Sequence, residues 1–227
     1  IVITAQTNFG NGYPERNIQT GGFSYKYDKC DMHSNPEAIA AQETYLRDLV
    51  KHTNPYTGLA YKDDPSIVGF EINNEPCHSG TKEEVKAYIN RMLKSMSKAG
   101  NRKPVFYNVS HNGYVAEAYY ETTVQGTTYQ WYPIGLVSGQ TQQGNFLPYV
   151  DRYDIPFAGK VKEFNKKARM IYEFDPADIM YSYMYPAMVR TFRTAGFQWI
   201  TQFAYDPIDL AFANTEYQTH FLNLAYT

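Results

Sequence analysis

The sequence lacks several features that would assign it to a large class of proteins. No apolar run reaches the roughly 18 residues that a membrane-spanning helix needs. No predicted strand is followed by the Gly-rich fingerprint that holds the phosphates of a nucleotide. The net charge of the 227 residues is only −2, so the charge indicates neither a nucleic acid nor an acidic membrane surface as a partner. We therefore expect no membrane span and no nucleic-acid partner.

Cysteine is scarce as well, since Cys30 and Cys77 are the only two. Two cysteines are too few for a disulfide framework and leave three alternatives open: free thiols, one disulfide in an exported protein, or a zinc site completed by His33 and His78. A structural zinc site usually shows paired short spacings, and neighbouring ligands such as Cys77 and His78 are geometrically awkward. The spacing therefore disfavours zinc, and we expect neither a metal nor another cofactor.

Aromatic residues, by contrast, make up 16% of the chain and include 22 tyrosines. Tyr and Trp combine an apolar face with a polar tip, which suits stacking on sugar rings. Tyrosine is also an ordinary half-buried packing residue. The composition is thus consistent with sugar binding without deciding it.

The stretch Ser66–Pro76 changes from apolar to polar along its length. Its first part is typical of a buried strand, with β-branched and aromatic residues at Ile67, Val68, Phe70 and Ile72. Asn74 and Glu75 follow where the strand ends, and Pro76 cannot donate a hydrogen bond to a strand ladder. A buried strand that ends in an Asn-Glu pair places polar chemistry at the mouth of a parallel sheet or barrel.

Strands and helices alternate along the whole chain. We predict strands at about 1–7, 67–74, 105–110, 127–132, 169–174 and 198–204. We predict helices at about 36–52, 82–99, 114–121, 179–194 and 215–225. This alternation implies an α/β fold with a parallel sheet covered by helices, which fits a doubly wound sheet or a (β/α)8 TIM barrel. Since a full barrel takes about 250 residues, such a barrel would lack its first two βα units.

The chain opens on Ile1 inside a predicted strand. Chains rarely open within a buried strand, so we expect upstream sequence: a signal peptide, more of the domain, or both. We expect residues 1–227 to form a single, N-terminally truncated domain.

Two of the predicted strands end in glutamates, Glu75 and Glu173. Strand ends around a barrel meet at one mouth. Paired carboxylates there can act as acid/base and nucleophile on a glycosidic bond, if their environments keep one protonated and the other ionised. The alternative is that both are surface glutamates in loops.

The run 54–76, with Asp63-Asp64-Pro65 and Asn74-Glu75-Pro76, resembles the clan A retaining glycoside hydrolases. It is most similar to the family 5 endo-mannanases and cellulases, in which Asn-Glu-Pro ends the fourth barrel strand and a Glu ending the seventh is the nucleophile. Glu173 lies on the strand where this family would have that nucleophile. The resemblance covers most of the chain as architecture, but only residues 54–76 as a specific motif.

The resemblance implies a role for each matching residue. Glu75 would protonate the leaving oxygen and later activate water, and Glu173 would attack the anomeric carbon. Asn74 would hydrogen-bond the sugar 2-hydroxyl. His111 would match the family's active-site histidine, or is a solvated residue before a turn. Tyr132 would orient the nucleophile, or is a core residue.

The chain also departs from the family pattern. The region of the family's second-strand arginine is absent, and Thr7-Asn8-Phe9 replaces its third-strand histidine. Trp199 comes too early for the eighth-strand Trp, so Gln202, Phe203 or Tyr205 is expected to reach the mouth instead. The candidate sugar platforms, each of which equally fits packing, are Phe23, Tyr25, Tyr27 and Trp131. Tyr129 competes with Tyr132 for its role.

Two further acidic residues lie close to the glutamates. Glu71 precedes Glu75 by four residues on the same strand, and a buried carboxylate there needs a partner, so we expect a structural role. Asp175 shares a face with Glu173 and is either a rival nucleophile or a helix cap.

These observations favour a retaining glycoside hydrolase that cleaves a β-linked polysaccharide or oligosaccharide without a cofactor. A polymeric substrate implies a secreted or periplasmic protein. The alternative is a non-catalytic, carbohydrate-binding barrel derived from such an enzyme.

Overall fold

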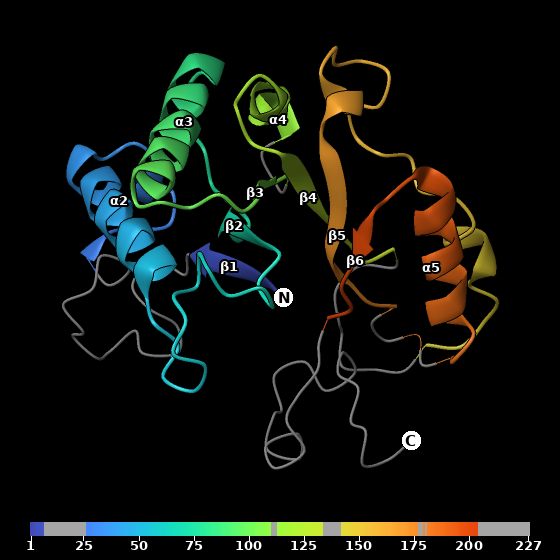
Figure 1. Cartoon of the computed structure of the whole chain (residues 1–227). Helices are drawn as coiled ribbons and strands as arrows, with labels where there is room; N and C mark the ends of the chain where they lie inside the picture. The colour runs from blue at the N-terminus through green and yellow to red at the C-terminus, as the bar shows by residue number, and fades with distance from the viewer. Residues whose placement is uncertain (7–25, 110–112, 134–141, 177–178, 180, 204–227) are drawn as a thin grey trace. The chain divides into compact units, whose positions relative to one another are not determined.

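The computed structural model describes residues 1–6, 26–109, 113–133, 142–176, 179 and 181–203 (Figure 1). The chain divides into two compact units. The first consists of Ile1–Thr128 and Gly159–Lys167, and the second of Tyr129–Ala158 and Ala168–Thr227.

The first unit contains a parallel sheet whose spatial order follows the sequence order. Its strands are β1 (Val2–Gln6), β2 (Gly69–Asn73), β3 (Val105–Asn108) and the start of β4 (Gly126–Trp131). A doubly wound sheet reverses its strand order at a switch point, whereas a barrel adds each strand beside the previous one. The order within this unit is therefore that of a barrel.

The strand β2 begins two residues later than the sequence predicts. Val68 is 46% exposed, so its prediction as a buried strand residue is wrong, whereas Phe70 and Ile72 are fully buried as expected. At Gly69 a side chain would meet the ring of Phe106 and a backbone carbonyl at 3.0 Å. The absence of a side chain thus lets β2 and β3 approach closely at the first residue of the strand.

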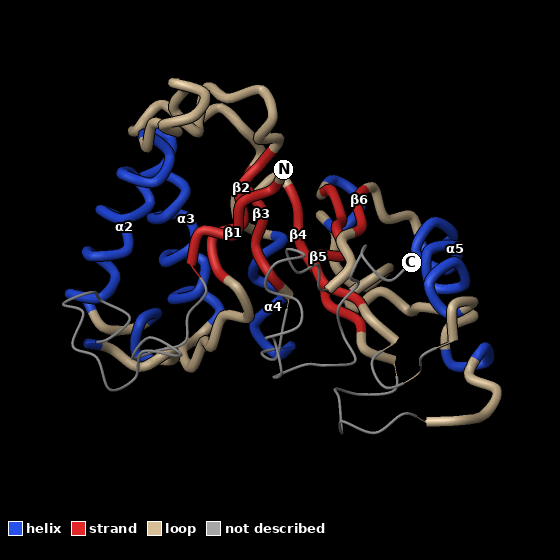
Figure 2. The backbone as a smooth tube through the Cα atoms, turned by 90° about the horizontal axis from the view of Figure 1, so that it is seen from below, coloured by secondary structure: helices blue, strands red, loops and turns tan. Residues whose placement is uncertain are grey.

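Three helices of the first unit lie on one side of its strands in both views (Figures 1 and 2). They are α2 (Pro36–Lys51), α3 (Lys82–Lys98) and α4 (Gly113–Tyr120). Asn35 caps α2 by accepting from two backbone N–H groups, and Thr81 and Glu84 form a capping box at α3. The predicted starts of α2 and α3 are confirmed.

The second unit contains the end of β4, β5 (Ala168–Phe174), β6 (Trp199–Ile200) and α5 (Met184–Ala195). The strands β5 and β6 are parallel. The strand β6 is shorter than predicted, although Gln198 N–H and Thr201 N–H still donate to β5 carbonyls. The predicted helix at 215–225 lies outside the described residues.

The helix α5 begins at Met184, five residues after its predicted start. A helix from residue 179 would place Pro186 in its interior, where proline has no N–H to donate and its ring clashes with the preceding turn. Starting at Met184 leaves Pro186 in the first turn, where no intrahelical N–H is needed.

No helix among the described residues is long and apolar enough to span a membrane.

Candidate active site

Glu75 lies just beyond the end of β2 in a backbone conformation that L-residues rarely adopt. Its φ angle is +45°, and it also precedes Pro76, which restricts the backbone further. Such a conformation costs about 1–3 kcal/mol and persists only where the surrounding structure enforces it. Asn74 N–H provides one anchor by donating to the Gln6 carbonyl of β1 at 2.8 Å. Among the described residues other than glycine, only Glu75 and Phe157 have a positive φ angle. Backbone strain of this kind clusters at active sites, which makes Glu75 a candidate on physical grounds.

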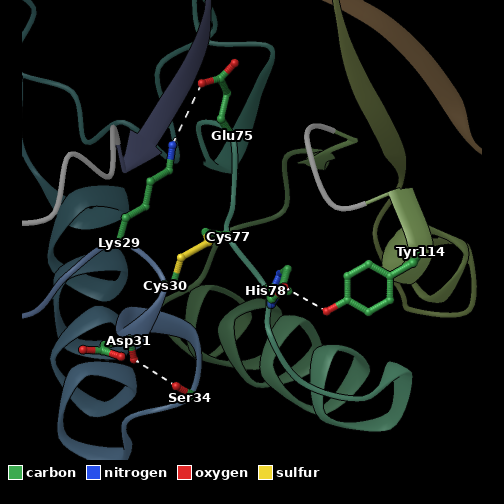
Figure 3. The surroundings of a disulfide bond; sticks show 8 residues. All are labelled: Lys29, Cys30, Asp31, Ser34, Glu75, Cys77, His78 and Tyr114. Carbon is green, nitrogen blue, oxygen red and sulfur yellow. Dashed lines mark hydrogen bonds and ion pairs between the residues drawn. A yellow bond between two sulfur atoms is a disulfide. The ribbon is translucent and has the colours of Figure 1, made fainter.

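The second anchor is a disulfide between Cys30 and Cys77, whose Cα atoms lie 4.7 Å apart (Figure 3). Of the three alternatives that the sequence left open, the structure shows the disulfide, so free thiols and zinc are wrong. The bridge joins the segment before the short helix η1 (Asp31–His33) to the residues that follow Glu75. Spatial proximity of two lone cysteines is a tertiary property, which their spacing of 47 residues does not reveal.

Lys29 forms an ion pair with Glu75, with Nζ 3.9 Å from Oε2 (Figure 3). Each side chain is about a quarter exposed, at 26% and 24%. No sequence pattern points to Lys29. Its position beside a cysteine is the only signal, and that position has no meaning until the disulfide is known.

In the second unit, Tyr132 and Glu173 are brought together. Tyr132 Oη donates to Oε2 of Glu173 at 2.8 Å, and the Phe203 ring lies edge-on to Tyr132 with centroids 6.3 Å apart. The resemblance expects this contact for a tyrosine that orients the nucleophile. The competing Tyr129 is only 1% exposed and packs against Phe197, as a core residue does.

Asp175 is fully buried and occupied by internal hydrogen bonds. Its Oδ2 accepts from Tyr185 Oη at 3.0 Å and from Gln202 Nε2 at 2.9 Å. Burial, and then the neighbouring Asp175 carboxylate, raise the pKa of Tyr185, which therefore keeps its proton and remains a donor. A carboxylate without solvent access does not reach a substrate, so this geometry argues against Asp175 as a rival nucleophile.

Of the other candidate substrate contacts, some make contacts within the protein and some lie outside the described residues. Gln202 Nε2 donates to the Phe203 carbonyl at 2.7 Å as well as to Asp175, so this amide supports local structure. Trp131 packs against Tyr153 and Phe192, with centroids 4.8 and 5.3 Å apart. The candidates outside the described residues are His111, Phe23, Tyr25 and Tyr205. Tyr27 donates to Glu37 at 2.7 Å.

A buried polar network lies at the end of β2, and the sequence did not reveal it. Asn73 Nδ2 donates to Tyr88 Oη at 3.0 Å and to Tyr107 Oη at 3.1 Å, and lies 3.3 Å from His33 Nε2. His78 Nε2 lies 2.7 Å from Tyr107 Oη. Burial lowers the pKa of His33 to about 4 and that of His78 to about 2, so both imidazoles are neutral at neutral pH.

Glu71 is also fully buried, and the prediction that it has partners is confirmed. Thr4 Oγ1 of β1 donates to Oε2 at 2.6 Å, and Thr128 Oγ1 of β4 donates to Oε1. These hydrogen bonds link three strands of the first unit through one carboxylate, which is a structural role.

Several known proteins are similar to this chain, although no family model matches it. Over 64 residues it is 31% identical to mannan endo-1,4-beta-mannosidase 3 of Arabidopsis thaliana, a match of 27% of this chain and 16% of that protein. The chain resembles the family 5 mannanases.

Solved structures support this family 5-like assignment of the fold. The endo-1,4-beta-mannanase of Rhizomucor miehei matches 98% of the chain with a TM-score of 0.66 and 17% identity. The endo-1,4-beta-D-mannanase of Thermotoga petrophila also matches 98%, with a TM-score of 0.65 and 15% identity. A glycoside hydrolase family 5 mannosidase of R. miehei matches 85%, with a TM-score of 0.59 and 15% identity. These similarities show the fold of part of a TIM barrel.

The chain is shorter than the proteins it resembles. It spans 66%, 70% and 53% of these three solved chains and 16% of the Arabidopsis enzyme.

Proposed function

We propose that this chain belongs to a retaining glycoside hydrolase that cleaves β-linked mannan by double displacement. The observation that carries the proposal is the hydrogen bond from Tyr132 to Glu173 at the end of β5. A charge-assisted hydrogen bond of this kind fixes the direction of a carboxylate and favours its ionised form, as a nucleophile requires. The mannanase names of its relatives motivate the choice of mannan.

In this proposal Glu173 attacks the anomeric carbon and forms a glycosyl-enzyme while Glu75 protonates the departing oxygen. Glu75 then takes a proton from water while the water oxygen attacks the anomeric carbon and breaks its bond to Glu173, which releases the sugar with its original configuration. Asn74, beside Glu75, binds the 2-hydroxyl. His111, Trp131, Gln202 and Phe203 remain proposed substrate contacts.

The finer features of the fold belong to the same proposal. We propose a (β/α)8 barrel that lacks its first two βα units in this chain and that forms one domain over residues 1–227. The disulfide supports a secreted or periplasmic protein, because such bridges persist in oxidising compartments.

A non-catalytic, sugar-binding barrel is the second candidate. Gln202 favours it, because its amide nitrogen, expected at the mouth, donates to Asp175 and Phe203 instead. Such a protein would bind mannan oligosaccharides and release no product during long incubation.

Replacement of the proposed nucleophile separates the two candidates. Glu173→Gln should lower turnover of an activated aryl β-mannoside by about a thousandfold or more, since the residue forms a bond in the transition state. Azide should rescue Glu173→Ala and yield the inverted mannosyl azide. Glu121→Gln, on the exposed surface beside Lys86, is the matched control and should retain activity. Full activity of Glu173→Gln would overturn the proposal.

A crystal structure with a bound oligosaccharide gives a second test. We expect the carboxyl groups of Glu75 and Glu173 to lie about 5–5.5 Å apart, the separation of retaining enzymes. A separation of about 6.5–9.5 Å would indicate an inverting enzyme instead.

A further inference from the structure

Lys29 and Glu75 lie in two separate segments of the chain, and the disulfide connects these segments close to both residues. Cys30 follows Lys29 directly, and Cys77 lies two residues after Glu75. The bridge therefore links the segment that carries the ammonium group to the segment that carries the carboxylate. Figure 3 shows the Lys29 side chain extending from its position next to Cys30 toward Glu75, with its nitrogen pointing at the carboxylate.

The ion pair alone is too weak to fix this geometry. Its 3.9 Å separation exceeds hydrogen-bond length, and both side chains keep about a quarter of their surface exposed. Partly exposed pairs contribute little, because solvent screens them and long side chains lose entropy when they are held together. Something other than the pair must hold Lys29 near Glu75.

The segment that follows Lys29 is itself fixed to the core. Met32 is fully buried, and its carbonyl accepts from Gln42 Nε2 of α2. The ring of His33 lies against that of His78, with centroids 4.4 Å apart. Cys30 lies two residues before Met32 and Cys77 directly before His78, so the disulfide joins this fixed segment to the strained residue Glu75.

We propose that Lys29 is a positioning residue for Glu75 and that the Cys30–Cys77 disulfide holds it in place. This inference rests on the proposed role of Glu75 as acid/base. In the first step the Glu75 carboxyl must present its proton to the leaving oxygen, and in the second its carboxylate must accept one from water. A fixed ammonium beside the carboxylate limits the side-chain rotamers of Glu75, so the carboxyl group keeps one direction in both steps.

The proposal predicts a dependence on the leaving group that general destabilisation would not produce. A 2,4-dinitrophenyl β-mannoside needs no proton to lose its aglycone, whereas a phenyl β-mannoside and mannan do. In Lys29→Met, kcat/KM should fall about tenfold on the latter two, because the proton donor is misplaced, and stay within about twofold on the first. Lys29→Arg should restore most of the loss.

Control variants test whether the effect is specific to Lys29 and whether it depends on the disulfide. Lys26→Met is the control, since Lys26 pairs with Glu37 and should change no substrate's rate. Cys30→Ser combined with Cys77→Ser, and reduction of the unmodified protein by dithiothreitol, should reproduce the selective loss. An equal loss on all substrates, or full activity on mannan without Lys29 or without the bridge, would overturn the proposal.

A double-mutant cycle tests the ion pair without an activity measurement. In urea unfolding of the oxidised protein, Lys29→Met and Glu75→Gln together should change the unfolding equilibrium constant by a factor of about 2–5 less than the product of their separate effects. After reduction of the disulfide, the two effects should simply multiply. Absence of coupling in the oxidised protein would overturn the inference. If the protein hydrolyses no β-mannoside, the proposed function fails while this cycle still decides whether the bridge holds Lys29 to Glu75.

Discussion

Tyr132 makes the contact on which the proposed nucleophile depends, and its hydroxyl can be removed alone. Tyr132→Phe keeps the ring beside Phe203 and deletes the donor to Glu173. Hydrogen bonds to charged groups contribute about 1.5–3 kcal/mol, so kcat should fall about tenfold to a hundredfold. Steady-state kinetics should show this loss mainly in kcat, with a melting temperature near that of the unmodified protein.

The matched control for this variant is Tyr149→Phe. Tyr149 is 59% exposed, and removing its hydroxyl should change neither kcat nor KM. Equal activity of Tyr132→Phe and the unmodified protein would show that Tyr132 does not orient the nucleophile.

Individual residues differ in how far the sequence alone reveals them. Glu75, Glu173 and Tyr132 come from strand ends and a short motif, which are local patterns. Lys29 and Asn73 act through partners remote in sequence, the one pairing with Glu75 and the other with tyrosines of α3 and β3. Local patterns carry no information about such pairings, so the residues around the proposed acid/base were missed.

The network that links η1, β2 and α3 makes the stability of the protein depend on pH. Burial lowers the pKa of His33 to about 4 and that of His78 to about 2, below the 6.5 of a free histidine. As pH falls through 6.5, the unfolded chain binds protons that these folded histidines do not. Stability is therefore full above that pH and falls below it, by up to about 1.4 kcal/mol per pH unit for each histidine.

Urea unfolding at pH 7.5, 6.0 and 5.0 measures this slope. His33→Asn should remove one histidine's share of it, whatever its effect on absolute stability. His52→Gln, at an exposed position, is the control for removing a histidine outside this network. A free energy of unfolding that is constant between pH 6.5 and 5 would show that the two imidazoles are not buried in the neutral form.

Helices and strands were predicted best where the determining chemistry is local. Asn35 and the Thr81–Glu84 pair set the starts of α2 and α3, and both starts were predicted from side chains that cap adjacent N–H groups. The start of α5 differs from the prediction because Pro186 fits a helix only in its first turn, and a start at Met184 meets that condition. The strand β6 is shorter than predicted because only Trp199 and Ile200 pair regularly with β5, although hydrogen bonding to β5 continues on either side.

The order of the strands is the feature that distinguishes a barrel from a doubly wound sheet. Alternation in the sequence predicts parallel strands but leaves both architectures open. Neither unit reverses the strand order, and the solved mannanase structures, which match 98% of the chain, support the fold of part of a TIM barrel. The order in which strands pair depends on contacts across the core, so it became known only with the structure.

The disulfide allows a test of whether residues 1–227 behave as one domain. Both cysteines belong to the first unit. In the chain-entropy model, a disulfide across a 47-residue separation stabilises the folded state by about 4 kcal/mol. The strand β4 contributes residues to both units, and a barrel has a single core, so we expect one cooperative transition. Reduction should then lower the protection of the slowest-exchanging amides equally in α3 and α5, as measured by hydrogen exchange. Loss of protection in α3 alone would mean that the units unfold separately and that the single-domain prediction is wrong.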